Sequence, residues 1–216
     1  MLLSLDVGFR NMGWSAIDDK SRELIDCGVI QTRKAKDKRI KYTDQFYKNA
    51  QDLFHGLSEL VKKVEPFAMI GELPHGGGQN ARAIAQMMSA VSIVSGVSFF
   101  HDLPTEWCTP TDVKMAVTGK QNASKMDIML AIAKKFEIPI EQKEIGCRVT
   151  KKNKNGTRTE RRFIFKDQRI NEGRFEHIAD SCGAYLALVN SPICMIGRNL
   201  TRKEGKYCVK KSLMAA

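Results

Sequence analysis

Short apolar runs, separated by polar and turn residues, alternate along the first 32 residues of the chain. They span Leu2–Val7, Gly13–Ile17 and Ile25–Ile30, and a polar segment at residues 18–21 separates the last two. Short apolar runs joined by turns are typical of β-strands that pair with their sequence neighbours. The pattern therefore predicts a three-stranded β-meander at the start of the chain.

The spacing of the apolar residues then changes to a helical period, which begins at Thr43 and ends at Pro66. Phe67–Leu73 has the length and continuous apolarity of a buried strand, and the Gly-rich segment 74–80 predicts a loop. A helix rich in Ala, Ser and Met follows at residues 81–96. Its small side chains permit close approach to the sheet or to a second subunit, and we prefer sheet packing to a ligand role for its methionines.

A further strand and two helices are expected next. The strand ends at Cys108, and the segment after it resembles a helix start with Thr111 as its cap. Ser124 opens a second helix through a capping pattern, and this helix runs to about Phe136.

Residues 137–175 differ in composition from their surroundings and are expected to be an insertion. Two segments rich in basic residues, 147–152 and 158–165, flank Asn155-Gly156. Asn-Gly is a strong signal for a tight hairpin turn, so the pattern predicts a basic β-hairpin. Two interpretations of this hairpin stay open, a surface loop and an arm that lies against DNA.

Length and composition favour one folded domain that carries this insertion, since 216 residues bury a good core. We expect the domain at residues 1–190 and a basic C-terminal extension at 191–216. The chain shows neither a signal-peptide pattern nor a stretch of about 18 uncharged apolar residues, so we expect a soluble, cytoplasmic protein that avoids membranes. Six scattered cysteines without metal-ligand spacing indicate reduced thiols.

The net charge of +11 is concentrated in three segments. Residues 33–41 hold six Lys/Arg against one acid, residues 148–174 ten against three, and residues 191–216 six against one. The rest of the chain is therefore acidic. This division suits a polyanion binder, whose basic segments contact phosphates while an acidic cleft holds cations. Taken singly, each basic segment also fits a solvated loop.

Four candidate functional residues lie where strand ends or a helix face would present them to one cleft. Asp6 ends the first apolar run, and Glu72 ends the buried strand. His177 and Asp180 are three residues apart in an apolar helical segment, so they share a helix face. Clustered carboxylates repel one another unless cations bind. Two Mg²⁺ ions about 3.5–4 Å apart can both activate water and neutralise the leaving oxygen of a phosphodiester. The four residues therefore predict a metal-dependent nuclease site.

The order of the elements is that of an α/β, ribonuclease H-like fold, with a mixed five-stranded sheet flanked by helices. The motifs are similar to those of RuvC-type Holliday junction resolvases. Asp6 to Gly13 resembles that family's Asp-x-Gly-x-x-x-x-Gly opening, and His177 to Asp180 resembles its closing His/Asp-x-x-Asp. Residues 110–125 resemble its Pro-x-x-Val-Lys stretch, Gly loop and lysine-bearing helix start. An Asp-x-Gly opening also occurs in sugar kinases and actin-like ATPases, but the ordered set of motifs is more specific.

The resemblance implies roles for these positions. The implied metal ligands, which also serve catalysis, are Asp6, Glu72, His177 and Asp180. They would hold two Mg²⁺ ions per site, or Mn²⁺, with His177 either as a nitrogen ligand or as a base for the attacking water. Lys114 and Lys125 would stabilise charge at the scissile phosphate, and Lys120 would contact DNA. A satisfied helix histidine and ordinary exposed lysines are the alternative interpretations.

The chain also departs from the family. In the bacterial proteins an aromatic residue soon after the second acid wedges into the junction, whereas here the comparable residue is His75, which would stack on a base. Further DNA contacts are expected from the insertion, at Lys151, Lys152, Arg161 and Arg162. The insertion and the basic tail are additions to the family pattern, and they suggest a phage or viral relative that acts in a bacterium or an infected host cell.

The resulting hypothesis is a metal-dependent endonuclease that nicks opposed strands of four-way DNA junctions as a homodimer. A less selective nuclease for branched DNA or RNA/DNA hybrids is one alternative. A non-catalytic junction-binding or packaging protein is another, against which the intact acids count. An actin-like phosphotransferase would need more phosphate-binding Gly loops than the single candidate at residues 76–78.

Overall fold

The computed structural model describes residues 1–32, 39–73, 80–146, 157–203 and 206–209. The helices and strands of these residues, in chain order, are β1 (Leu2–Asp6), β2 (Asn11–Asp18), β3 (Glu23–Gln31), α1 (Tyr42–Val64), β4 (Met69–Glu72), α2 (Ala81–Phe100), β5 (Thr105–Cys108), α3 (Pro110–Thr118), α4 (Lys125–Lys135), β6 (Ile140–Gly146), β7 (Thr157–Phe165), β8 (Gln168–Asn171), α5 (Glu172–Leu188), α6 (Pro192–Arg198), β9 (Leu200–Lys203) and β10 (Lys206–Val209).

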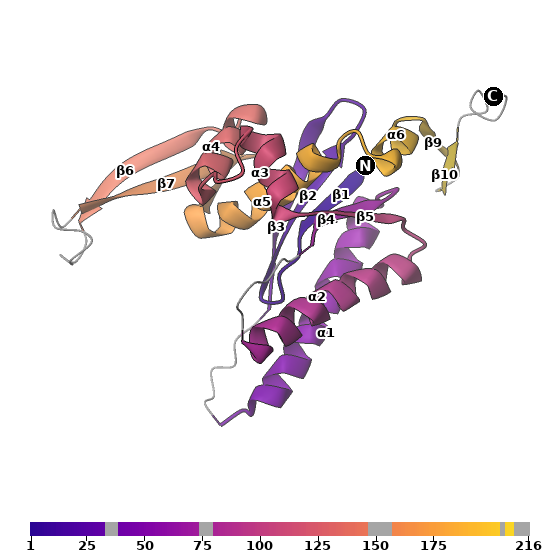
Figure 1. Cartoon of the computed structure of the whole chain (residues 1–216), viewed down its shortest axis with the longest axis horizontal. Helices are drawn as coiled ribbons and strands as arrows, with labels where there is room; N and C mark the ends of the chain where they lie inside the picture. The colour runs from indigo at the N-terminus through magenta and orange to yellow at the C-terminus, as the bar shows by residue number, and fades with distance from the viewer. Residues whose placement is uncertain (33–38, 74–79, 147–156, 204–205, 210–216) are drawn as a thin grey trace.

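A mixed five-stranded sheet in the order β3-β2-β1-β4-β5 forms the centre of the molecule (Figure 1). β1, β2 and β3 pair antiparallel, which confirms the predicted meander. β4 and β5 add in parallel on the other side of β1. The carboxyl ends of β1, β4 and β5 therefore meet at one edge of the sheet, as the expected α/β fold requires.

Helices cover both faces of this sheet. Leu3 and Leu5 of β1 belong to one buried cluster with residues of α1 and α2. The alternate residue Ser4 points the other way and donates a hydrogen bond from its hydroxyl to the Ser181 carbonyl of α5, at 2.6 Å. Burying a leucine side chain contributes about 1.5–3 kcal/mol, so this alternation fixes which face each residue takes. Asp6 is two residues after Ser4 on the same strand, so its side chain lies on the same face of the sheet, toward α5.

Capping residues set the starts of α3 and α4. Ser124 and Asp127 form the predicted capping box at α4. At α3 the predicted cap, Thr111, is wrong, because Thr109 is the cap and forms the box with Asp112. The proline ring fixes a helical φ and removes a donor that the first helical position does not use, so Pro110 takes that position and the cap is Thr109, two residues before Thr111.

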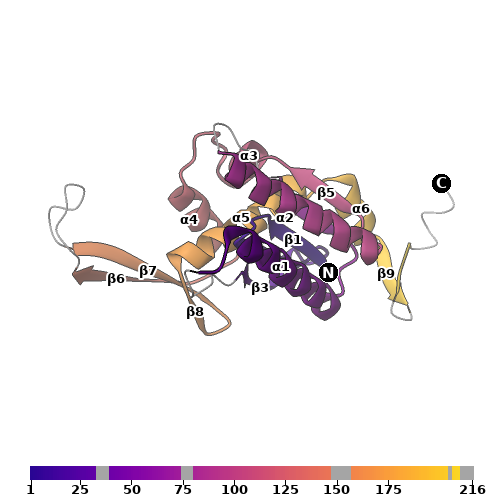
Figure 2. The same cartoon turned by 90° about the horizontal axis from the view of Figure 1, so that it is seen from below.

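The insertion forms a separate three-stranded sheet, β6-β7-β8, that projects away from the central sheet (Figures 1 and 2). The predicted strand at 158–165 is confirmed as β7, and its partner is β6. The predicted strand 147–152 and its turn lie outside the described residues. Phe163 of β7 stacks on Phe175 of α5, with ring centroids 3.7 Å apart and both side chains fully buried, so this arm is anchored to α5.

The start of the expected C-terminal extension packs on the domain. In α6, Cys194 is fully buried, and Arg198 pairs with the buried Asp19 at 3.1 Å. Tyr185 of α5 donates its hydroxyl to the same carboxylate at 3.0 Å. α6 is thus fastened to the core, while the division at residue 190 stays a prediction.

Among the described residues, α2 is long and apolar enough to cross a membrane by those two measures alone, and 17% of its apolar window is buried. The expectation that no such stretch exists is therefore wrong for α2. Core helices of soluble proteins satisfy the same two measures, so the length and apolarity of α2 are weak evidence for a membrane span.

Candidate active site

Asp6 and Glu72 end adjacent parallel strands at the same edge of the sheet. Asp6 is the last residue of β1, Glu72 is the last residue of β4, and the two are partners in the strand register. Register partners on neighbouring strands project side chains from the same face. The strand pairing therefore brings the two predicted carboxylates side by side.

Gly13 allows α5 to reach these acids. It is the β2 partner of Asp6, and a Cβ atom at Gly13 would lie 2.0 Å from the His177 carbonyl oxygen. Only a residue without a side chain permits this approach. As a result, His177 Nδ1 lies 2.7 Å from Asp6 Oδ2, within hydrogen-bonding distance. The hydrogen bond raises the pKa of His177, against the effect of its partial burial.

Asp180 lies one helical turn beyond His177 and adds a third carboxylate. Burial, followed by the charges of Asp6 and Glu176, raises the pKa of Asp180 to about 7. Burial, followed by the charges of Asp180 and Asp6, raises the pKa of Glu72 to about 8. Each acid thus resists ionisation of the others, which is how carboxylates behave when they share a site without a cation.

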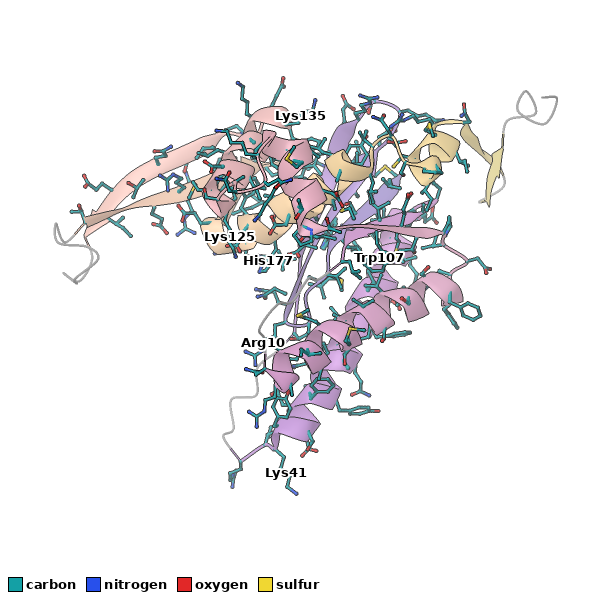
Figure 3. The ribbon with its side chains drawn as sticks, in the orientation of Figure 1. Arg10, Lys41, Trp107, Lys125, Lys135 and His177 are labelled. Carbon is teal, nitrogen blue, oxygen red and sulfur yellow. The ribbon has the colours of Figure 1, made fainter. Side chains whose placement is uncertain are left out.

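Two predicted lysines lie close enough to act on these acids. Lys114 of α3 lowers the pKa of Glu72 by its charge, against the larger effect of burial. Lys125, which Figure 3 labels, lies at the start of α4 and pairs with Glu176. That hydrogen bond is the main cause that raises the pKa of Lys125. The acids Asp180 and Asp6 raise it further. Both lysines therefore belong to the same electrostatic site.

Glu176 was missed from the sequence. It directly precedes His177 and lies four residues before Asp180, so helical spacing alone would have placed it beside the site. Glu176 neither ends an apolar run nor matches a motif, so these two signals do not point to it. The predicted DNA contact Lys120 lies instead on the exposed connection between α3 and α4, where its charge acts on Asp127.

The acids fit a hard divalent cation by chemistry, because Mg²⁺ prefers carboxylate oxygens and a cation would relieve the repulsion that raises their pKa values. Within the described residues, no three His, Cys, Asp or Glu side chains are arranged to hold a metal ion as they stand. Asp6 Oδ2 already lies within hydrogen-bonding distance of His177 Nδ1. The acids therefore fit a cation by their chemistry, while their present arrangement is not that of a formed metal site.

The predicted DNA contacts of the arm are not gathered on one surface. Arg161 and Arg162 are neighbours on β7, so their side chains project from opposite faces. Arg161 pairs with Glu172 at 3.1 Å, and Arg162 pairs with Glu160. The other predicted DNA contacts, His75, Lys151 and Lys152, lie outside the described residues.

Comparison with known sequences identifies bacterial resolvases as relatives. The chain is 28% identical over 136 residues to the crossover junction endodeoxyribonuclease RuvC of Cytophaga hutchinsonii, which covers 62% of this chain and 64% of that protein. It is 24% identical over 164 residues to the RuvC of a Prochlorococcus marinus strain, which covers 72% of this chain and 98% of that protein. No family model matches the chain.

Comparison with solved structures finds the same fold in Holliday junction resolvases. The structure of Thermus thermophilus RuvC in complex with a Holliday junction substrate matches with a TM-score of 0.56 and 15% identity, over 86% of this chain and 90% of that one. The yeast mitochondrial Holliday junction resolvase Ydc2 matches with a TM-score of 0.54 and 13% identity, over 92% of this chain and 81% of that one. The chain is thus similar in sequence to bacterial RuvC proteins, and it shares the ribonuclease H-like fold of RuvC-type Holliday junction resolvases.

Proposed function

We propose that the chain is a metal-dependent, structure-selective DNA endonuclease that resolves four-way junctions by paired nicks. The observation that carries this proposal is the meeting of Asp6, Glu72, His177 and Asp180, from β1, β4 and α5, at one edge of the sheet. The named activity of the relatives supports the choice of a junction as substrate, because those proteins are crossover junction endodeoxyribonucleases.

In this proposal Asp6, Glu72 and Asp180 hold two Mg²⁺ ions, or Mn²⁺. Bound ions would activate the attacking water and neutralise charge on the leaving oxygen. The three carboxylates position the ions by their fixed places on two strands and one helix. Their ionisation is tied to ion binding, because a cation favours the charged form of groups whose pKa is otherwise raised.

His177 is proposed as the base for the attacking water. With Asp6 ionised, His177 Nδ1 donates a proton to Asp6 Oδ2, which leaves Nε2 as the ring nitrogen that accepts. A proton taken from water at Nε2 is then stabilised by the Asp6 charge. Direct attack by this water leaves a 5′-phosphate and a 3′-hydroxyl, while Lys114 and Lys125 stabilise charge on the phosphate.

A homodimer is proposed, with α2 as its contact surface. Ile84, Met88 and Phe99 on this helix are 48%, 58% and 87% exposed, which is unusual for large apolar side chains. Ser92 and Gly96 lie on the same exposed side, and an added Cβ at Gly96 would meet nothing within 4 Å. Small residues flanked by large apolar ones allow two helices to pack closely, and a two-fold axis places two active sites on symmetric strands.

The dimer proposal is tested by sedimentation velocity on Met88→Glu, which is expected to convert a dimer to a monomer while the fold stays intact. Tyr47→Glu, an equally exposed site on α1, is the control and should leave the dimer unchanged. A native chain that sediments as a monomer, or that pellets with phospholipid vesicles, would contradict the proposed use of α2.

The remaining expected DNA contacts stay proposals, namely His75, Lys120, Lys151, Lys152, Arg161 and Arg162. The same holds for a cytoplasmic location, which is consistent with bacterial relatives that act on DNA, and for the division of the chain at residue 190. A phage or viral origin stays a prediction.

The main test is cleavage of end-labelled four-way junction, replication fork, RNA/DNA hybrid and linear duplex in Mg²⁺, with Asp180→Asn as the matched variant. Symmetric nicks in the junction that disappear in Asp180→Asn are the expected result. Equal cutting of all branched substrates or of the hybrid would instead favour the less selective nuclease. Tight junction binding without any cut would make the chain a binding protein.

A further inference from the structure

An aromatic and cationic cluster occupies the ends of α1 and α2 that lie nearest the acids. The Phe9 ring stacks on Phe46, with centroids 4.7 Å apart, and the Tyr42 ring packs against Phe46 at 6.0 Å. The Arg82 guanidinium lies over the Tyr42 ring, 4.7 Å from its centroid. Gln86 Nε2 lies 3.5 Å from the Tyr42 hydroxyl. The four contacts hold Tyr42 and Arg82 in place at the surface.

The cluster lies at the catalytic edge of the sheet. Phe9 comes three residues after Asp6, in the turn that leaves β1, and α2 begins shortly after Glu72 at the end of β4. In the view of Figure 3, Arg10 lies between His177 and Lys41. A DNA strand that passes the acids would therefore meet this surface next.

The charges here differ from those further along α1. Lys48, Lys62 and Lys63 each pair with a carboxylate. By contrast, Arg10, Lys41 and Arg82 are exposed, and within the part of the chain that the structure describes no carboxylate pairs with them. Unpaired cations beside an exposed aromatic ring are the combination by which proteins hold unpaired nucleotides.

We infer that Arg82 and Tyr42 form a stacking platform for an unpaired nucleobase of branched DNA, with Arg10 and Lys41 against the flanking phosphates. The base stacks on the guanidinium, which Tyr42 supports from beneath, and Phe46 supports Tyr42 in turn. Guanidinium planes and aromatic rings both accept bases in this way. The inference rests on the proposed function, because it needs a substrate in which a base has left its pair at a branch point.

The test uses the full native chain in Ca²⁺, and follows binding to a labelled four-way junction and to a linear duplex of the same length. Arg82→Lys keeps the positive charge but removes the planar guanidinium on which the base would stack. Tyr42→Ala removes the ring that lies beneath that guanidinium. Each is expected to weaken junction binding about tenfold and to leave duplex binding unchanged. Tyr42→Phe should bind as the native chain does, and Tyr47→Ala, which removes a tyrosine that is 65% exposed on the same helix, is the control.

A second readout reports on stacking directly. 2-Aminopurine placed at the branch point is expected to be quenched by the native chain and by Tyr42→Phe, but not by Arg82→Lys. Arg82 is exposed, so this variant keeps the fold, and thermal unfolding of Tyr42→Ala shows whether its loss is local.

Three outcomes would overturn the platform: junction binding by Arg82→Lys equal to that of the native chain, an equal loss on linear duplex, or the same loss in Tyr47→Ala. Cleavage of the junction by the native chain in Mg²⁺ is measured in parallel. Absence of that cleavage contradicts the proposed function, whereas normal cleavage together with unaffected variants contradicts the platform alone.

Discussion

The active-site edge of the sheet and the β6-β7-β8 arm both pack against α5, but their charges are arranged differently. Like charges lie together at the edge, whereas opposite charges form pairs in the arm. At the active-site edge, Glu72 and Asp180 are largely buried, carry the same sign and raise each other's pKa. In the arm, Arg161 pairs with Glu172 and Arg169 with Glu141 at the surface. These ion pairs of the arm are balanced as they stand, whereas the active-site edge is favourable only when a cation or protons balance its charge. Unbalanced like charge therefore distinguishes the edge of the sheet at which we propose the active site.

The largest expected effect comes from exchanging one acid in each region for its amide. Glu72→Gln should lower junction cleavage by about 10³-fold, because the metal site loses a charged ligand worth several kcal/mol. Glu172→Gln should leave cleavage nearly unchanged, because it removes only a partly buried ion pair between the arm and the start of α5. Single-turnover cleavage of a labelled junction in Mg²⁺ measures both.

The same pair has an opposite effect on stability. Without metal, Glu72→Gln should raise the melting temperature at pH 8, because it removes a buried acid that opposes its neighbours. Glu172→Gln should not raise it. A Glu72→Gln variant that keeps its activity, or that melts earlier than the native chain, would remove the contrast between the two regions.

The next effect in size concerns the way α5 approaches the sheet. Gly13→Ala should cost about 1–3 kcal/mol of unfolding free energy and about 10²-fold in cleavage, since the new Cβ would lie 2.0 Å from the His177 carbonyl oxygen and would push His177 from Asp6. Gly173→Ala, near the arm end of α5, is the control, because its nearest neighbour there would be 3.8 Å away. Chemical denaturation and cleavage assays measure the two variants. Equally small losses of stability and cleavage in both variants would show that α5 leaves room for a Cβ at Gly13 as well as at Gly173.

Much of the fold and of the active site follows from local patterns in the sequence. The alternation of Leu3, Ser4 and Leu5 fixes both faces of β1, and it thereby fixes the direction of Asp6. The i, i+3 spacing of His177 and Asp180 puts both on one side of α5. Such features are readable because strand and helix periods are short.

Other features depend on contacts between segments far apart in the sequence. That Gly13 accommodates α5 involves a residue 164 positions away, so no local pattern reveals it. The pairing of β7 with β6 could not be predicted from the Asn-Gly signal alone, because β6 lacks the alternating apolar pattern and has five residues of mainly polar type between Ile140 and Gly146. The Lys125–Glu176 pair likewise joins α4 to α5 across the insertion.

A smaller effect is expected from pH in the absence of metal. The raised pKa values of Glu72 and Asp180, about 8 and about 7, mean that the folded protein keeps protons which the unfolded chain releases above its ordinary values of 4.5 and 3.8. The free energy of unfolding therefore falls as pH rises between these values. His177, whose pKa is raised from 6.5, stabilises the fold below that value and loses this contribution as pH rises through its raised pKa, so it acts in the same direction.

Thermal unfolding in EDTA should accordingly give a melting temperature about 3–8 °C lower at pH 8.5 than at pH 5.5. Mg²⁺ should remove most of this difference, because it binds the ionised carboxylates and its affinity rises with pH. Glu72→Gln should reduce the difference as well. A melting temperature that rises with pH in EDTA would contradict the charge repulsion that we assign to the active-site edge.

The smallest effect is expected in the arm, where each arginine must exchange an ion pair for a phosphate. Arg162→Gln should weaken junction binding about two- to threefold and lower the salt slope by about one, because an exposed ion pair is worth only about 0.2–1 kcal/mol to break. Arg161→Gln should have a smaller effect than Arg162→Gln, since its side chain pairs with Glu172 and lies on the opposite face of β7, on the side where Phe163 packs against α5. Binding titrations at several salt concentrations distinguish the two. If both variants lowered the slope equally, DNA would have to contact both faces of the arm, and if neither did, the ion pairs of Arg161 and Arg162 would serve the structure of the arm alone.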